Sequence, residues 1–460
     1  MSEYTSRTSA TPDDSLIHLH AMRHERYAAA TALLGESGFA TRVGGFNALV
    51  RLADEWLADE RTPEEQRLAE AQVIIDTFCA CIYAPFLPAS RHKDYMRLNR
   101  EPKKRWDSQK KARFRAEQAE FRAEARFRQT VLDTIHLRVM TRYEGPGPWS
   151  RLSFDFSGSV FFYPVSFGRS QWEGRLNLRG CTYYAEADFS GSTYTWYLDC
   201  SNSAYYTEAD FSGSTYNGGV NASFCNYRGN VDFSDSVYRA NASLSYNVYW
   251  GEAALNDSIY EGHADLACCT YVGHASLGNC DYRRGADLFL STYATFADLD
   301  RCTYGGRANL SKSVYYGRAW FWHSTYLQEA TFGDSIYNDS VDFSDSHFAG
   351  PVNLEDSAYL DTTNFQNTIF EEDSPSFARS VYVPENNEHT GYNYGVVRVL
   401  TLDELQHLDQ LREPRYEIEQ ELFNVDDATD AKTYRILRRA LLEASHPIQK
   451  WCQELMAGTL

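Results

Sequence analysis

Histidine and cysteine are the residues of this sequence best suited to catalysis or metal binding, and their spacing decides what they can do. His263 and His274 lie eleven residues apart, with Glu261 and Asp265 close to the first of them. Such a set would suit a metal ion or general acid–base catalysis if the side chains converged on one point. Whether they converge depends on how the chain coils, because the pair lies inside a long internal repeat.

The ten cysteines of the 460-residue sequence do not follow the spacing of a disulfide framework, which is typical of a protein from a reducing compartment. Cys79 and Cys81 have no second Cys or His pair at zinc-ligand spacing, so a zinc site is not expected. Cys280 and Cys302 are 22 residues apart and would reach disulfide distance in a coil of that period. In a reducing compartment we expect them to be packed free thiols instead.

No Ser-His-Asp arrangement, glycine-rich phosphate loop or dinucleotide fingerprint occurs in the sequence. We therefore expect a non-enzymatic protein that uses no cofactor, metal ion or small-molecule substrate. Residues 1–14 lack a basic segment followed by an apolar one, and prolines interrupt the longest apolar run, residues 77–89. Together with the cysteine usage, these features predict a cytoplasmic protein.

An eleven-residue repeat dominates the sequence between residues 156 and 382. Its third slot is Phe or Leu at 18 of the 20 strictly spaced positions from Phe156 to Phe365. Serine or cysteine usually follows three residues later, and an aromatic residue, most often tyrosine, comes two residues after that. Self-similarity at a fixed period is the sequence signature of a solenoid.

Apolar residues two positions apart point the same way on an extended chain, so each unit supplies two short inward-facing strands. Two strands cannot enclose a core, whereas four can, and one coil therefore takes two units. The sequence predicts a mainly β fold, a quadrilateral β-solenoid of about ten coils over residues 150–384, with residues 22 apart stacked at roughly 4.8 Å. His263 and His274 would then lie on opposite faces and could not bind one ligand.

Helical segments are expected before the solenoid. Residues 1–14 are polar and predicted to be disordered, and residues 15–90 show the apolar periodicity of a helical bundle. Thr62 is predicted to cap the third helix, with Pro63 at the first helical position and Glu65 completing the capping box.

Residues 91–149 are predicted to be a basic helical connector, with 14 Lys/Arg against 6 Asp/Glu between residues 91 and 130. Phe114, Phe121 and Phe127 alternate there with charges, which predicts an exposed helix crossed by ion pairs. Two interpretations of the 91–128 helix stay open. It contacts nucleic acid or a membrane surface, or it is a solvated helix that lies against the acidic solenoid of its own chain.

A helical C-terminal cap is expected over residues 385–460, where it would protect the open end of the solenoid. A loop is predicted near residues 384–394, and Thr401 and Glu404 form a capping box that opens a helix. Further helices are predicted over residues 415–423 and 430–456.

The outward polar slot of the repeat supplies the first candidate site. Asp188, Asp210 and Asp232 would form a column of carboxylates about 5 Å apart on one face, whereas Asp199, Asp265 and Asp287 lie on the opposite face. Residues 151–380 hold 13 Lys/Arg against 28 Asp/Glu, within a net charge of −19 for the chain. The carboxylates either bond to the backbone at the corners and keep the solenoid soluble, or they present an acidic surface to a partner.

An aromatic departure from the repeat supplies the second candidate site. Trp320 replaces the expected Asp, and Tyr316 and Trp322 also occupy outward or corner positions. Exposed aromatic residues on a rigid surface are typical of a hot spot for protein binding. Packing of these corners under a terminal domain would account for them equally well.

The repeat resembles the pentapeptide-repeat family, on the strength of units such as Ala-Asp-Phe-Ser-Gly-Ser-Thr-Tyr at residues 187–194. The resemblance implies a right-handed quadrilateral β-helix of the variant in which five- and six-residue faces alternate. Tyrosine stands here where phenylalanine is more usual. The helical segment around residues 42–49 is similar to the N-terminal module of actinobacterial members, some of which carry membrane segments that this sequence does not contain.

The function we expect is protein–protein interaction on a rigid scaffold. The resemblance implies an alternative, because quinolone-resistance members of the family mimic duplex DNA and bind gyrase. The column of Asp188, Asp210 and Asp232 would then bind gyrase or another DNA-binding protein. Those members dimerise through a C-terminal helix, so residues 401–456 are candidates for the contact of a homodimer.

Overall fold

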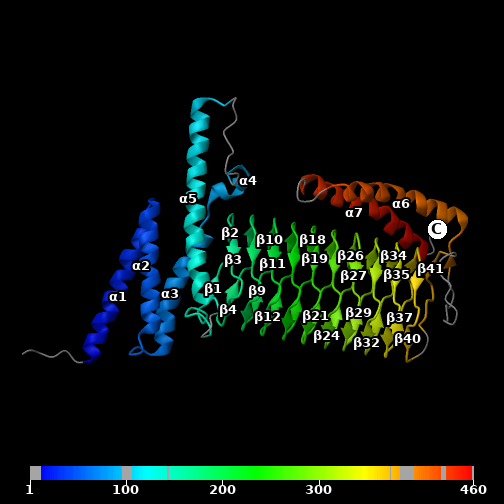
Figure 1. The fold of residues 1–460 in the computed structure, drawn as a ribbon, viewed down its shortest axis with the longest axis horizontal. Helices are drawn as coiled ribbons and strands as arrows, with labels where there is room; N and C mark the ends of the chain where they lie inside the picture. Colours follow the sequence, from blue (N-terminus) through cyan, green and yellow to red (C-terminus); the bar gives the residue numbers. More distant parts are fainter. Residues whose placement is uncertain are drawn as a thin grey trace, which may run out of the picture.

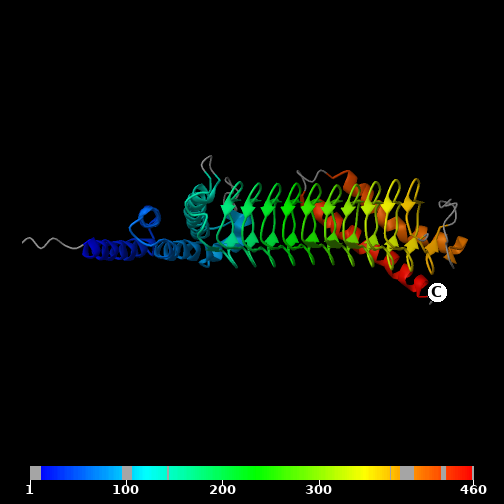
Figure 2. The same ribbon diagram turned by 90° about the horizontal axis from the view of Figure 1, so that it is seen from below.

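The structure is a computed structural model that describes residues 12–95, 106–141, 145–372, 375–383, 398–425 and 431–457. It contains a long parallel β-solenoid with helices at its N-terminal end and along one side (Figures 1 and 2). Of the predicted disordered segment 1–14, residues 12–14 belong to the first helix, and the remainder lies outside the described residues. The predicted loop at 384–394 also lies outside them.

The N-terminal helices form one bundle that closes the end of the solenoid. Rings of Phe46, Phe78 and Phe127 meet at its centre, and Phe78 stacks on Trp149 just ahead of the first coil, with 6.0 Å between ring centroids. The helical prediction for this region is confirmed. Its elements are α1 (Pro12–Leu34), α2 (Phe39–Ala58), α3 (Glu64–Tyr83), η1 (Leu87–Arg91), α4 (His92–Tyr95) and α5 (Ser108–Val139).

The start of α3 differs from the prediction. Pro63, not Thr62, is the N-cap residue, and no side chain caps the helix there. The buried hydroxyl of Thr62 lies 3.0 Å from Nε2 of His20 on α1 and is committed to that contact. Glu64 and Glu65 stay in the first turn, where negative charge favours the helix dipole.

Helix α5 is not the exposed helix that its charge pattern predicted. Phe114, Phe121 and Phe127 are buried, and Phe121 packs against Phe162 of the first coil at 4.8 Å between ring centroids. The helix stands across the end of the solenoid rather than along its length (Figure 1). Its acidic residues do form the predicted ion pairs, but with partners inside the N-terminal bundle: Glu117 with Arg91 and Arg113, and Glu124 with Arg42 and Arg128.

Each coil of the solenoid contributes one short strand to each of four parallel sheets. The first coil supplies β1 (Phe154–Asp155), β2 (Val160–Phe161), β3 (Val165–Ser166) and β4 (Gln171–Trp172). Sheets 1 to 4 begin with these strands and end with β37 (Val352–Asn353), β42 (Arg398–Val399), β39 (Thr363–Asn364) and β40 (Ile369–Phe370). Residues 22 apart pair in register, as in Phe154 with Leu176, so the predicted two-unit coil is confirmed.

Stacked rings fill the lumen. Phe189 lies over Phe211 at 5.0 Å between ring centroids, and Tyr194 lies over Tyr216 at 5.1 Å, with ring planes 7° apart in both pairs. Burying each such side chain stabilises the fold by roughly 1.5–3 kcal/mol. The Phe/Leu slot and the tyrosine slot of every unit therefore stack into one continuous core.

The small slot between these rings holds a ladder of hydroxyls and thiols. Ser192 Oγ donates to the Phe167 carbonyl at 3.1 Å and accepts from the Ser170 amide at 3.1 Å, which links successive coils. Cys280 and Cys302 fill the same slot as free thiols, as predicted, and each Sγ donates to a backbone carbonyl at 3.3 Å. Burial raises the pKa of Cys302 well above its ordinary value.

Two corners of each coil contain a residue with positive φ, two positions after the Phe/Leu slot. We call the corner between sheets 1 and 2 corner I, and the corner between sheets 3 and 4 corner II. Glycine occupies this position in early coils, as in Gly180 of corner I (φ 68°) and Gly191 of corner II (φ 62°). Later coils keep the conformation with other residues, as in Leu290 (φ 56°) and Arg301 (φ 53°).

The C-terminal helices α6 (Leu402–Phe423) and α7 (Ala431–Met456) lie along the side of the solenoid rather than across its end, where the cap was expected (Figure 1). The capping box of Thr401 and Glu404 is confirmed, and α6 continues through Pro414 as one helix. Leu408, Ile448 and Leu455 are buried in a cluster with Val314 and Ile336 of sheet 2. The docked apolar face, rather than an open end of the solenoid, therefore accounts for the amphipathic C-terminal sequence.

Candidate partner-binding site

The predicted acidic column is present, and its carboxylates stabilise their own corners. Asp188, Asp210 and Asp232 lie on β7 (Ala187–Asp188), β11 (Ala209–Asp210) and β15 (Val231–Asp232) and are neighbours in register. Oδ1 of Asp188 accepts hydrogen bonds from the amide of Ser190 at 3.0 Å and from its hydroxyl at 2.7 Å. Asp210 and Asp232 do the same for the serines two residues on.

The two candidate histidines are not brought together. His263 lies on β21 (His263–Asp265) of sheet 1, where its Nε2 is 3.1 Å from Oδ2 of Asp287. His274 precedes sheet 3 and stacks on Phe296 at 4.9 Å between ring centroids. Among the described residues, no group of three or more His, Cys, Asp or Glu side chains could hold a metal ion.

Tyr316 is buried beneath the C-terminal helices and does not belong to an exposed aromatic surface. Only 1% of the residue is accessible, its hydroxyl donates to Gln449 Oε1 at 3.3 Å, and the guanidinium of Arg415 lies 5.4 Å from its ring centroid. Packing under a terminal domain, which the sequence left open, therefore accounts for Tyr316.

Trp320 and Trp322 belong to an aromatic band that crosses sheet 3. Trp320, on β31 (Ala319–Trp320), packs edge-on against Phe296 at 4.5 Å and against Trp322 of corner II at 6.2 Å. His274 extends the band by stacking under Phe296. Both tryptophans are half-buried, so part of each ring faces solvent.

A groove of about 560 Å³ separates this band from α6 and α7. Trp320 and Phe296 form one wall, and Leu422, Tyr434 and Leu441 face them from the helices. Phe423, 89% exposed, lies at its edge. A volume of this size, apolar with a few polar groups, is typical of binding pockets in proteins. The polar groups of the lining are Thr295, Arg318, Asp339, Arg415, Glu419 and Arg438.

An ion pair between the buried Arg415 and the half-buried Glu419 fixes the helical wall of the groove. Arg415 pairs with Glu419 one turn further along α6 and donates to the Ala294 carbonyl and to Ser445 Oγ, both at 2.7 Å. Burial lowers the pKa of Arg415 and raises the pKa of Glu419. Because Arg415 joins the solenoid to both helices, the two walls of the groove are held at a fixed separation.

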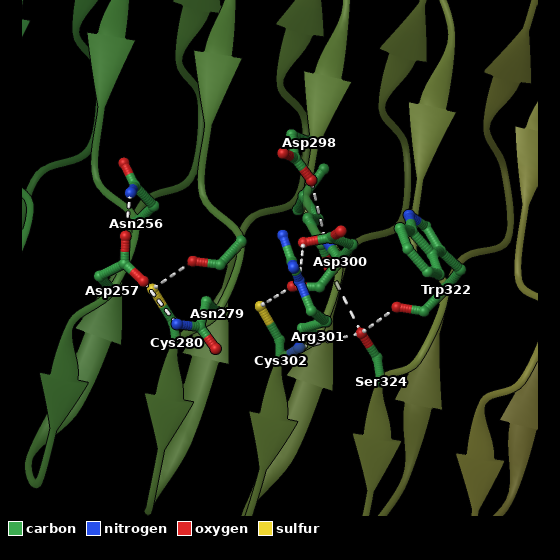
Figure 3. A network of polar contacts seen from close by, with 12 residues as sticks. Asn256, Asp257, Asn279, Cys280, Asp298, Asp300, Arg301, Cys302, Trp322 and Ser324 are labelled. Carbon is green, nitrogen blue, oxygen red and sulfur yellow. Dashed lines mark hydrogen bonds and ion pairs between the residues drawn. The ribbon is translucent and has the colours of Figure 1, made fainter.

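A pair of carboxyl groups lies one coil before Trp322 (Figure 3). Asp298 is the neighbour of Trp320 in sheet 3, and Asp300 occupies the slot that holds a serine after Asp188, Asp210 and Asp232. Burial, together with the charge of Asp300, raises the pKa of Asp298 to about 6.

Arg301 connects this carboxyl pair to the aromatic band. Its Nε donates to Asp300 Oδ1 at 3.2 Å, and its guanidinium lies 5.9 Å from the ring centroid of Trp322. The surface beside the groove therefore carries both charged and aromatic side chains.

The sequence did not point to Phe296 or to the groove residues that α6 and α7 contribute. Phe296 could have been found with the 22-residue rule, which places it in the loop directly below Arg318 and beside Trp320. Leu422, Phe423 and Leu441 carried no such signal, because only the docking of the helices brings them to sheet 3.

Comparison of the chain with protein-family models, with curated proteins and with solved structures produced no match. Among the described helices, none is by itself long and apolar enough to cross a membrane, and only α3 with the η1–α4 segment passes that test, as a pair bent by 46°.

Proposed function

We propose that this protein is a non-enzymatic scaffold that binds a protein partner in the groove between Trp320 and the C-terminal helices. One observation carries the proposal: the aromatic band and the helices enclose an apolar groove whose walls are tied together by Arg415. A half-buried tryptophan in a rigid depression is the usual centre of a binding hot spot. The repetitive solenoid supplies the rigidity that such a preorganised site needs.

The groove fits a partner segment with one large apolar side chain flanked by polar groups. Trp320, Phe296 and Leu422 would surround the apolar side chain, and Arg318 and Asp339 would meet the polar groups at the rim. We propose in addition that the chain is a pentapeptide-repeat protein, because four parallel sheets with a 22-residue register have the geometry which that resemblance implies. The ten free thiols support the prediction of a reducing, cytoplasmic environment.

Affinity capture with three versions of the full chain tests the proposed groove. The baits are the natural chain, Trp320→Ala and Trp196→Ala, and captured proteins are quantified by mass spectrometry. Trp196, 57% exposed in the loop before sheet 1, is a matched control for loss of an exposed tryptophan. We expect a partner that the natural chain and Trp196→Ala retain and that Trp320→Ala loses. Equal capture by all three baits would contradict the proposal.

A further inference from the structure

Four successive coils place apolar residues at the positive-φ position of corner I. Phe224, Tyr246, Cys268 and Leu290 are spaced 22 residues apart and have φ values between 56° and 58°. Phe224 and Leu290 are 56% exposed, and Tyr246 is 52% exposed. The rings of Phe224 and Tyr246 stack in solvent at 4.7 Å, with their planes 6° apart. We call these four residues the corner I ladder.

The fold does not require apolar residues at these positions. Positive φ costs a non-glycine residue conformational energy, and glycine, asparagine and aspartate tolerate it best. Corner II has the same geometry in the same coils, yet three of its four residues there are Asp235, Asp257 and Asn279, with φ values of 54° to 57°, and the fourth is the polar Arg301 (φ 53°). The ladder therefore combines backbone strain with exposed apolar surface, and the solenoid gains little core from it.

Polar residues limit the ladder at both ends. Along corner I, Asn202 precedes Phe224 by one coil, and Lys312 and Asp334 follow Leu290. A contiguous exposed apolar patch with a polar rim is characteristic of an interaction site. Four coils at the inter-strand spacing give the patch a length of roughly 14 Å.

A helix that lies along the solenoid axis matches this patch. The rise of a helix per turn, about 5.4 Å, is close to the spacing between coils of about 4.8 Å, so each turn meets roughly one coil. Helix α7 already uses this geometry over sheet 2, where Ile448 and Leu455, seven residues apart, are buried against the solenoid side.

The negative charge beside the ladder indicates which charge the partner should carry. Asp199, Asp265 and Asp287 occupy outward slots of sheet 1, three residues ahead of corner I in their coils. In the other coils the same slot of sheet 1 holds Asp, Asn, Ser or Thr. The one lysine or arginine within the described strands of this sheet is Arg307, at the first position of β29 (Arg307–Asn309), where it pairs with Glu329. A helix on the ladder would therefore meet negative charge along one flank.

We propose that the corner I ladder binds an amphipathic helix of a partner protein, with one apolar side chain per turn on the ladder and Lys or Arg residues toward sheet 1. This surface lies on a different corner from the Trp320 groove and does not depend on it. The scaffold would then hold two partners at fixed positions along its length.

A designed peptide tests the proposal by fluorescence anisotropy. The probe is a helical peptide of about 14 residues, or four turns, with leucine at every third or fourth position and lysine beside it. A scrambled peptide of the same composition is the first control. We expect the amphipathic peptide to bind the full chain at least about tenfold more tightly than the scrambled one.

The decisive variant combines Phe224→Asn, Tyr246→Asn and Leu290→Asn. Asparagine tolerates positive φ, so we expect the variant to melt no lower than the natural chain and yet to bind the amphipathic peptide as weakly as the scrambled one. The matched control, Asp235→Asn with Asp257→Asn on corner II, should bind within about twofold of the natural chain.

Three results would overturn the proposal. Equal binding of both peptides would mean that charge alone attracts them. Unchanged binding by the triple variant would place the peptide elsewhere on the surface. A dimer of the natural chain in sedimentation, absent in the triple variant, would mean that a second copy occupies the ladder.

Discussion

The tyrosine hydroxyls are the least satisfied groups of the repeat. A buried tyrosine hydroxyl ordinarily finds a hydrogen-bond partner, and Tyr359 does donate to the Leu354 carbonyl at 3.1 Å. Tyr205 is also deeply buried, but its hydroxyl has no hydrogen-bond partner. Stacking holds its ring parallel to that of Tyr183, with ring planes 3° apart, so its oxygen cannot shift toward a donor or acceptor.

Tyr205→Phe should therefore stabilise the solenoid, whereas Tyr359→Phe should destabilise it. Removing an unpaired buried hydroxyl relieves a desolvation penalty, and removing a paired one loses a hydrogen bond, each worth about 1 kcal/mol. Urea unfolding of the two variants beside the natural chain measures the difference. A lower midpoint for Tyr205→Phe would show that the hydroxyl has a partner after all.

The carboxyl pair beneath the tryptophans should make the stability of the natural chain depend on pH. The pKa of Asp298 is about 6 in the folded chain against an ordinary value of 3.8, so the folded state binds the proton more tightly. The contribution of Asp298 to the free energy of unfolding is therefore fully present below about pH 4, and it is lost as the pH rises through 6. Because Asp298 is partly exposed, the loss should be about 1 kcal/mol.

Asp300→Ser should remove that pH dependence, because a serine in this slot donates to the preceding aspartate, as Ser190 does to Asp188. The reciprocal variant, Ser190→Asp, should create a similar dependence in an earlier coil. Urea midpoints at pH 4 and pH 7 measure both. Parallel pH profiles for all three chains would contradict the assigned role of the pair.

At the scale of elements, docking of α6 and α7 is a separate event from coiling. Ile448 is fully buried at the contact between α7 and sheet 2. Ile448→Asp would place an unpaired charge there, which costs several kcal/mol. We expect amide hydrogen exchange to accelerate in both helices and to stay slow in the coils. Unchanged exchange in α7 would show that the helices are held by other contacts.

The sequence predicted the helices more reliably than their positions. Capping chemistry is local, so Thr401 and Glu404 identified the start of α6. Docking is not local: the burial of Phe121 against Phe162, and of Ile448 in the Val314 cluster, depends on where the chain returns in space. For that reason α5 was predicted to be exposed, and the C-terminal helices were predicted to cover an end instead of a side.

At the scale of the molecule, the repeat determined the fold because its period is strict. Because residues 22 apart pair in register throughout, residues in the same slot of the repeat stack on one another. The residue type that recurs in one slot therefore predicts a whole column of side chains. Residues that break the repeat pattern, such as Trp320 in the outward polar slot and Phe224 at a corner, stand out against the same columns. The groove itself could not be predicted, because half of its lining comes from helices outside the repeat.

The same register allows the acidic column to be tested without damage to the fold. Asn221 already bonds to Ser223 as the aspartates of the column bond to their serines. Asp188→Asn, Asp210→Asn and Asp232→Asn together should keep the melting temperature and leave capture at the Trp320 groove unchanged. Salt-sensitive binding of the natural chain to gyrase, lost in this variant, would instead establish that the column imitates DNA.

Photo-crosslinking from Trp322, beside the groove, tests whether a partner binds there. A photoreactive phenylalanine replaces Trp322 in one version of the full chain and Trp196 in another, and both are irradiated in the native host. We expect one partner to crosslink from position 322, no such product from position 196, and loss of the product when Trp320→Ala is added. Crosslinking of the same proteins from both positions, or a product unaffected by Trp320→Ala, would show that no partner binds in the groove.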